Sequence, residues 1–198
     1  MDKFSYAIGL GIGQNLLSMG AKGIELDDFA QAIKDILEGN KTAISHAEAR
    51  DIVNKYFAEL EEKMNAASIE QGVQFLEENK KRPNVVTLPS GLQYEVINEG
   101  KVGTYAKATD QVKCHYEGTL IDGTLFDSSI KRGQPAVFGV NQVIPGWVEA
   151  LQLMPEGAKW KLYIPSDLAY GAQGAGEMIP PHSTLIFEVE LLEILSQK

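Results

Sequence analysis

The chain has 198 residues, of which 27 are acidic and 18 are basic, and its formal net charge is −9. Acidic residues outnumber basic ones both before and after residue 82, so the charge gives no support to a protein that binds nucleic acid. The single cysteine, Cys114, excludes an internal disulfide and fits a reducing compartment.

Apolar runs and the N-terminus bear on where the protein resides. No run of about 18 apolar residues is present, so the sequence predicts no membrane span. The first residues, Met1-Asp2-Lys3-Phe4, lack the basic and apolar regions of a signal peptide. We therefore expect a cytoplasmic protein, or a periplasmic or surface-attached one if a leader has been removed.

The distribution of proline divides the chain into two parts. All eight prolines lie from Pro83 to Pro181, and both tryptophans also follow residue 82. A proline-free segment rich in Ala, Glu, Lys and Leu is typical of helices, whereas the rest alternates with period two and is punctuated by Gly and Pro. We predict an α+β protein with an all-helical domain at 1–82 and a sheet domain at 83–198.

Two short helices are expected first. Apolar residues recur at helical spacing over 4–16 and again over 29–37, and the second stripe stops at Gly39. Gly9 and Gly13 form a G-x-x-x-G motif. Because no strand precedes this motif and no lysine follows it, it predicts a close contact between helices rather than a phosphate-binding loop.

A much longer helix is expected next. Ser45 and Glu48 form a capping box and no proline follows until Pro83, which predicts a helix over about 45–82 that is about 55 Å long. Its apolar stripe is longer than the two short helices can cover. The uncovered part therefore needs a partner, or it extends into water as a spacer. Three such helices have too small a core to be stable alone, and a twofold homodimer through 1–82 is the commonest solution.

Alternation of apolar and polar residues predicts the sheet domain. A hairpin turn at Asp122-Gly123 is expected to bring Phe126 and Asp127 back beside Tyr116. Alternation with one apolar face favours an antiparallel sheet wrapped around a short helix. Strands are expected over 92–98, 111–120, 125–128, 159–164 and 184–195, and the helix from near Pro145 through Leu153.

Several motifs of the sheet domain carry a resemblance to a known family. The runs V-K-C-H-Y-E-G, L-F-D-S-S, V-I-P-G-W and I-P-P-H-S-T-L-I-F-E-V-E-L occur in this order between residues 91 and 195. They resemble the FKBP-type peptidyl-prolyl cis-trans isomerases. The helical segment before them is similar to that of the Mip-like branch, whose N-terminal helices intertwine in a homodimer and whose third helix holds each catalytic domain away from the dimer.

The resemblance implies an activity and its partners. It implies isomerisation of X-Pro bonds during protein folding, with proline-containing peptides and unfolded proteins as substrates. It also implies chaperone activity from the cleft of the dimer, inhibition by macrolides of the FKBP class, and no cofactor or metal.

The resemblance also implies a pocket in which Trp147 is the floor and Arg132 is the partner of the Asp127 carboxylate. Without the family, each aromatic residue indicates core and Asp127 a turn residue. However, an apolar sheet face that carries polar groups needs a reason to place them there. The expected catalytic residues are Tyr116, Phe126, Asp127, Ile144, Trp147, Tyr170 and Phe187, and the substrate-binding set adds Arg132, Phe138, Val143 and Ile179.

Other functions stay open as alternatives. Hydrolysis has little support, because His46, His115 and His182 have no spaced nucleophile or metal-ligand partners. A module that binds proline segments without turnover, and a holdase chaperone that binds unfolded chains, remain. Four positions depart from the single-domain members of the family: Ala136, Gln142, Leu168 and Ala175. Gln142 and Leu168 fit the Mip-like branch, whereas Ala136 and Ala175 bear on substrate preference and macrolide affinity.

Overall fold

The computed structural model describes residues 1–195 and separates into two compact units. The first is Met1–Lys63, and the second begins at Met64. Residues 64–82, which we expected to belong with the helical segment, therefore belong to the same compact unit as the sheet. The predicted border near Pro83 between a dimerisation part and a catalytic part stays a prediction.

The first unit consists of helices. It contains α1 (Lys3–Ser18), α2 (Leu26–Glu38) and the first half of α3 (His46–Asn79). The capping box is present, since the Glu48 backbone N–H donates to the Ser45 hydroxyl at 3.1 Å. The backbone N–H of Lys22 donates to the Tyr56 hydroxyl at 3.1 Å, which ties the α1–α2 loop to α3. The three predicted helices are confirmed.

The first unit has no hydrophobic core of its own. None of residues 1–63 is buried, and Leu26 and Leu37 on α2 are 74% and 80% exposed. A Cβ atom added at Gly9 or Gly13 would meet nothing within 4 Å. The close helix contact expected at these glycines is therefore not made within one chain, and a contact with a second copy stays a prediction.

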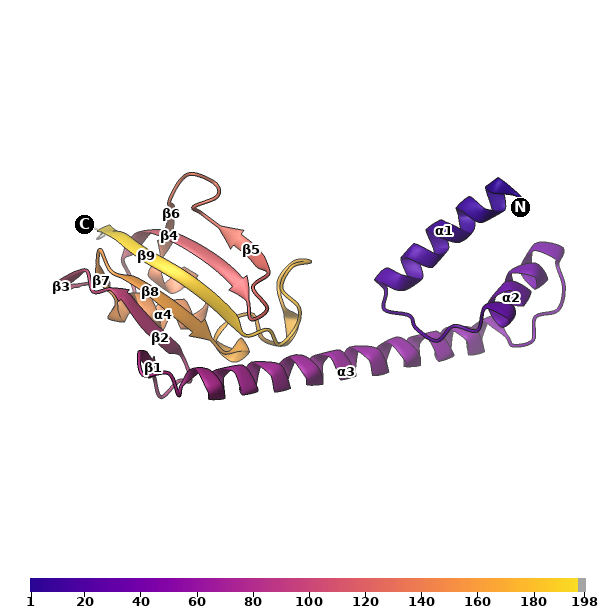
Figure 1. Cartoon of the computed structure of the whole chain (residues 1–198), viewed down its shortest axis with the longest axis horizontal. Helices are drawn as coiled ribbons and strands as arrows, with labels where there is room; N and C mark the ends of the chain where they lie inside the picture. Colours follow the sequence, from indigo (N-terminus) through magenta and orange to yellow (C-terminus); the bar gives the residue numbers. More distant parts are fainter. Residues whose placement is uncertain (196–198) are drawn as a thin grey trace. The chain divides into compact units, whose positions relative to one another are not determined.

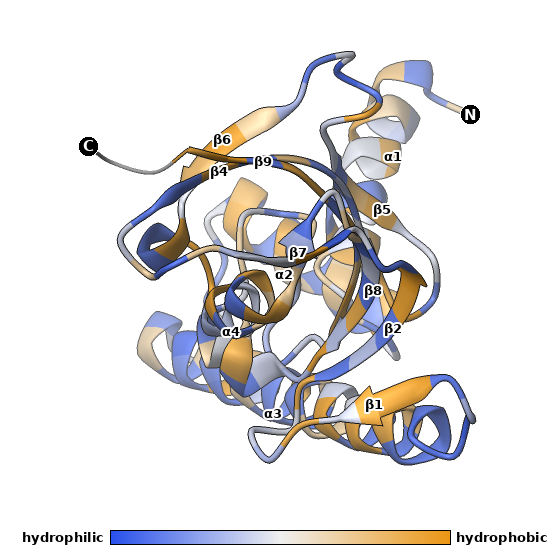
Figure 2. Ribbon diagram, turned by 90° about the vertical axis from the view of Figure 1, so that its left-hand side faces the viewer, coloured by the Kyte–Doolittle hydropathy of each residue, from blue (hydrophilic) through white to orange (hydrophobic). Residues whose placement is uncertain are grey.

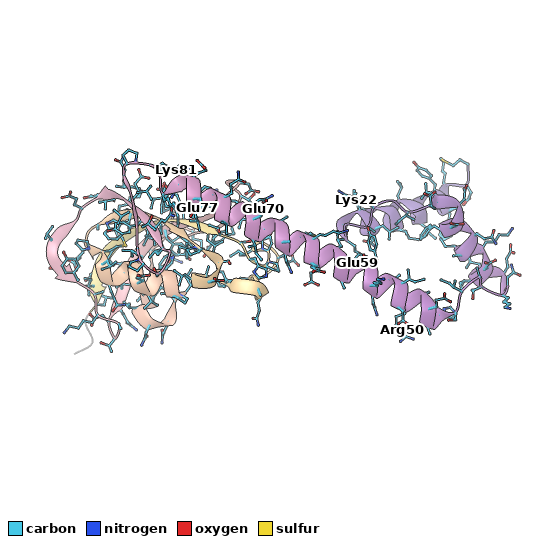
Figure 3. The ribbon with its side chains drawn as sticks, turned by 90° about the horizontal axis from the view of Figure 1, so that it is seen from below. Lys22, Arg50, Glu59, Glu70, Glu77 and Lys81 are labelled. Carbon is cyan, nitrogen blue, oxygen red and sulfur yellow. The ribbon has the colours of Figure 1, made fainter. Side chains whose placement is uncertain are left out.

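The long helix α3 is polar and exposed over much of its length. Charged side chains at Arg50, Glu59, Glu70 and Glu77 follow one another along it (Figure 3), and hydrophilic and hydrophobic residues are mixed around it (Figure 2). Met64, in the middle of the apolar stripe, is 61% exposed. Within residues 1–195, none of the helices combines the length and apolar composition that crossing a bilayer needs.

The second unit is built on an antiparallel sheet of seven strands (Figure 1). All five predicted strands are present. Four further strands were not predicted because they are short or lack a buried face: β1 (Val85–Thr87), β3 (Lys101–Tyr105), β6 (Ala136–Gly139) and β7 (Pro155–Glu156). All residues of β3 are exposed. The sheet order is β1 (Val85–Thr87), β2 (Gln93–Asn98), β8 (Lys159–Ile164), β9 (Leu185–Leu195), β4 (Gln111–Leu120), β5 (Leu125–Ser128), with β6 (Ala136–Gly139) on β4, and β3 (Lys101–Tyr105) pairs separately with β7 (Pro155–Glu156).

The core lies between this sheet and α4 (Pro145–Leu153), around which β4, β9 and β8 curve (Figure 2). On β4, Val112, Cys114 and Tyr116 are buried, as the alternation predicted. Burial raises the pKa of the Cys114 thiol to about 12, which makes it a core residue rather than a reactive one. From α4, Trp147 and Leu151 fill the concave side of the sheet.

The end of α3 is attached to the outer part of the sheet by polar contacts. The buried side chains of Asn79 and Gln93 share a hydrogen bond of 2.8 Å, and Arg82 donates to the Tyr163 hydroxyl at 2.8 Å. A Cβ atom at Gly72 would lie 2.4 Å from the Thr184 hydroxyl. This glycine, which weakens the helix by propensity, therefore allows α3 to approach the chain just before β9.

Candidate functional site

A cavity of the second unit opens on the concave side of the sheet and has a volume of about 730 Å³. It is lined from β4, β5, β6, α4, β9 and the segments before α4 and β9. Ten of the eleven expected site residues line it, and Arg132 contacts two of them from outside. The ten are Tyr116, Phe126, Asp127, Phe138, Val143, Ile144, Trp147, Tyr170, Ile179 and Phe187.

Trp147 is the most buried of the residues that line this cavity. Pro145 occupies the first turn of α4, where its fixed φ suits a helix start and no N–H is needed. Trp147 follows two residues later and is 4% exposed. Its ring meets those of Tyr116 and Phe187 edge to face, with centroids 5.3 and 5.2 Å apart, which is a favourable geometry for aromatic pairs.

Gly118 leaves room for two of the lining rings and was not singled out from the sequence. It lies on the inward face of β4, two residues after Tyr116. A Cβ atom there would lie 2.6 Å from the Phe126 ring and 2.7 Å from the Phe187 ring. The glycine therefore sets the width of the cavity, because these rings occupy the space of the missing side chain.

A polar cluster stands at one wall of the cavity. The Tyr116 hydroxyl donates to the Asp127 carboxylate at 2.5 Å, and the Arg132 guanidinium donates to the Tyr116 hydroxyl at 2.8 Å. Arg132 also forms an ion pair with Asp127. The hairpin at Asp122-Gly123 makes this cluster possible, since it pairs Asp127 with Gly118 across β4 and β5, as expected.

The cluster shifts two pKa values in opposite directions. Burial opposes ionisation of Asp127, but the hydrogen bonds from Tyr116 and Arg132 and the charge of Arg132 outweigh it, so the pKa of Asp127 lies below its ordinary value. Burial, followed by the hydrogen bond to Asp127, raises the pKa of Tyr116. At neutral pH the cavity therefore holds a carboxylate and a neutral phenol.

Ser129 holds the backbone of Tyr116 in place and was also missed. It is fully buried, and its hydroxyl accepts the Tyr116 N–H at 2.8 Å and donates to the Tyr116 carbonyl at 3.2 Å. The Ser129 hydroxyl also lies 3.0 Å from His115 Nδ1. The only sequence signal was the Ser128-Ser129 pair after Asp127, which reads equally well as a turn.

Two hydrogen-bond donors at the cavity have no partner among residues 1–195. One is the backbone N–H of Ile144, which precedes α4 and whose carbonyl accepts from the helix. The other is the hydroxyl of Tyr170, a residue that lines the cavity and is 40% exposed. Both donors are available to a carbonyl group of a bound molecule.

A flap formed by residues 174–181 closes one side of the cavity. Ala175 and Ile179 pair through two backbone hydrogen bonds of 2.9 and 3.2 Å, which leaves 176–178 as the tip. Gly174, with φ at 61°, is required at its base, because a Cβ atom there would lie 2.2 Å from the Ile179 carbonyl. Gly176, Glu177 and Met178 also line the cavity, and these three were not among the expected site residues.

The positions that depart from the single-domain family pattern divide into two groups. Gln142 and Ala175 line the cavity, whereas Ala136 and Leu168 pack against the core.

Within the described part of the chain, no group of three or more His, Cys, Asp or Glu residues is placed to hold a metal ion.

Two family models match the chain. Residues 103–192 match the FKBP-type peptidyl-prolyl cis-trans isomerase, and residues 1–96 match the domain amino-terminal to FKBP-type peptidyl-prolyl isomerase. The chain therefore belongs to the FKBP-type peptidyl-prolyl cis-trans isomerases, and the expected family and fold class are confirmed.

Individual relatives agree over nearly the whole chain. The FKBP-type 22 kDa peptidyl-prolyl cis-trans isomerase of Escherichia coli K12 is 50% identical, covering 96% of this chain and 94% of that protein. The outer membrane protein MIP of Legionella longbeachae is 42% identical, covering 98% and 85%. The crystal structure of FkpA from Escherichia coli matches with a TM-score of 0.80 at 34% identity, over 98% of this chain and 96% of that one.

Proposed function

We propose that the cavity on the concave side of the sheet is where this isomerase turns over X-Pro peptide bonds of proline-containing substrates. One observation carries the proposal. A mainly apolar, aromatic cavity is joined to the cluster of Tyr116, Asp127 and Arg132. It also has two donors, at Ile144 and Tyr170, that find no partner among residues 1–195. Such a site binds a proline ring against Trp147 and leaves the carbonyl before it within reach of the donors.

The chemistry needs no covalent intermediate. A prolyl bond must twist through a state without amide resonance, over a barrier of about 18–20 kcal/mol. The twisted amide is less dipolar than the planar one, so an apolar cavity favours it over the ground state. The Ile144 N–H and the Tyr170 hydroxyl orient the carbonyl. Each reduction of the barrier by about 1.4 kcal/mol raises the rate about tenfold.

The test is exchange spectroscopy by NMR on a short X-Pro peptide, which needs no coupled protease. We expect a kcat/KM of roughly 10⁴ M⁻¹s⁻¹ or more. We also expect competition from a macrolide of the FKBP class, since its ring would occupy the same aromatic cavity. A rate equal to the uncatalysed one at micromolar protein would overturn the proposal and favour a module that only binds proline segments.

We also propose that two copies associate through the helical segment and that the dimer has chaperone activity. The support is the first unit, in which no residue is buried and α2 carries an apolar groove of about 320 Å³. The groove is lined by Phe29, Ala32, Ile33, Ile36 and Leu37. A second copy that covers this face would supply the core that the unit lacks. Suppression of aggregation of an unfolded protein by the full chain tests the chaperone activity.

A cytoplasmic location stays a proposal, supported by the single buried thiol. The alternative is a periplasmic or surface location. Fractionation of cells that express the full gene separates the two, because the protein would be found with cytoplasmic or with periplasmic and membrane marker proteins.

A further inference from the structure

The rim of the cavity carries one charge without a partner. Two carboxylates line the cavity, those of Asp127 and Glu177, and no Lys, Arg or His is among the lining residues. Arg132 forms an ion pair with Asp127, so these two charges compensate each other. Among residues 1–195, no cationic group forms an ion pair with Glu177. The site therefore has an uncompensated negative charge.

The backbone places this charge at the rim rather than at the floor. Glu177 is the middle residue of the flap tip, which the pairing of Ala175 with Ile179 closes. Ile179 is buried and anchors the flap, whereas Glu177 and its neighbour Met178 are exposed. The floor at Trp147 is apolar and buried. The Glu177 carboxylate is therefore on the exposed edge of the cavity, whereas Trp147 is on its buried side.

We propose that Glu177 is a specificity-determining residue that favours substrates with a lysine or arginine next to the proline. The inference rests on the proposed function of the cavity. An exposed carboxylate attracts a cation weakly in water, so we expect a discrimination of about two- to fivefold. Because both charges are solvated, salt must reduce this discrimination.

The experiment compares two sets of peptides by NMR exchange. In one set the residue before proline is Lys, Gln or Glu, and in the other the residue after proline varies in the same way. We expect kcat/KM to follow the order Lys, Gln, Glu in at least one set, with a spread of about two- to fivefold at low salt. At about 0.5 M salt the spread should fall by more than half.

Three variants assign the discrimination to one side chain. Glu177→Gln keeps the shape and should abolish the spread, and Glu177→Lys should reverse its order. Glu99→Gln makes the same change in net charge at an exposed residue outside the cavity and should keep the spread. Tm values of all variants are compared with that of the parent chain.

The outcomes separate this inference from the proposed function. Catalysis of the Gln peptide without a spread in either set would overturn the role of Glu177 alone. A spread that survives in Glu177→Gln would do the same. No catalysis of any peptide would overturn the proposed function, and the role of Glu177 with it.

Discussion

At the scale of single residues, the Tyr116 hydroxyl connects the aromatic and the polar parts of the site. It donates to Asp127, accepts from Arg132, and belongs to a ring that packs edge to face on Trp147. The buried hydroxyl of Ser129 holds the backbone of the same residue from behind. The orientation of Tyr116 therefore depends on partners from β5 and from the loop that follows it.

We predict that Asp127→Leu lowers kcat/KM on a short X-Pro peptide about tenfold or more. The variant keeps the branched shape of the side chain but removes a charge-assisted hydrogen bond, which is worth about 1.5–3 kcal/mol, and leaves Arg132 without its ion pair. Tyr116→Phe, which removes only the hydroxyl, should lower the rate less. Unchanged turnover of Asp127→Leu at an unchanged Tm would show that the carboxylate has a structural role only.

The pKa shifts of Asp127 and Tyr116 predict that kcat/KM does not change with pH between the two pKa values. The pKa of Asp127 lies below its ordinary 3.8, so its contribution to stability is present above that pH and is lost as the pH falls through the lower folded value. The pKa of Tyr116 lies above its ordinary 10.0, so its contribution is present below that pH and is lost as the pH rises through the raised folded value.

Neither group titrates in between, so kcat/KM for a neutral peptide should be constant from about pH 5 to about pH 9. NMR exchange across this range measures it directly. A transition near neutral pH would point to another titrating group in the site and contradict this assignment.

At the scale of elements, the last turns of α3 form part of the catalytic unit. The Asn79 side chain donates a hydrogen bond to that of Gln93, and the Gln93 amide donates to the Leu76 carbonyl at 2.9 Å. Phe75 packs on the Tyr163 ring, with the ring centroids 6.0 Å apart. This attachment explains why the compact unit begins at Met64 rather than at Pro83.

We predict that a protein starting at Pro83 is less stable than one starting at Met64 by about 2–4 kcal/mol. The estimate counts two or three hydrogen bonds at about 1 kcal/mol each and the partial burial of a phenyl ring. Urea unfolding of the two fragments measures the difference. Asn79→Ala in the longer fragment should cost about 1–2 kcal/mol. Equal midpoints for both fragments would show that the end of α3 adds nothing to the sheet.

At the scale of the whole molecule, the helical unit and the isomerase unit differ in how they are stabilised. The second unit buries residues of its sheet and of α4, whereas residues 1–63 bury none. An apolar face such as that of α2 is stable in water only when something covers it. The proposed dimer therefore accounts for a segment that the single chain leaves uncovered.

We predict that Leu37→Glu, in the α2 groove, converts a dimer into a monomer in sedimentation experiments at micromolar concentration. The charge would be placed in an apolar interface without a partner, at a side chain that is 80% exposed in the single chain. Gln31→Glu adds the same charge on the opposite face of α2 and should leave the dimer intact. A full-length parent protein that sediments as a monomer would refute the dimer.

The same variant separates the activity on peptides from that on large clients. Leu37→Glu should keep the peptide rate, because the cavity lies in the other unit. Refolding of a proline-limited protein should slow, since two linked cavities raise the effective concentration of catalyst near a captured chain. Equal refolding rates for parent and variant would contradict cooperation between the copies.

The four α-helices, five of the nine strands within residues 1–195 and ten of the residues that line the cavity could be predicted from the sequence. Capping at Ser45, the alternation along β4 and β9, and the turn at Gly123 act over a few residues, so a linear pattern carries them. The aromatic residues that line the cavity could be predicted because they lie in motifs, between residues 91 and 195, that occur in the same order as in the family.

Features that join residues far apart in the chain could not be predicted from the sequence and became visible in the folded structure. The Ser129 clamp on Tyr116, the space at Gly118, the attachment of α3 to the sheet and the position of Glu177 at the rim each depend on a neighbour from another element. Secondary-structure propensity carries no information on such neighbours, because a glycine or serine has the same conformational preference wherever it is packed. Packing in three dimensions gives these small residues their roles.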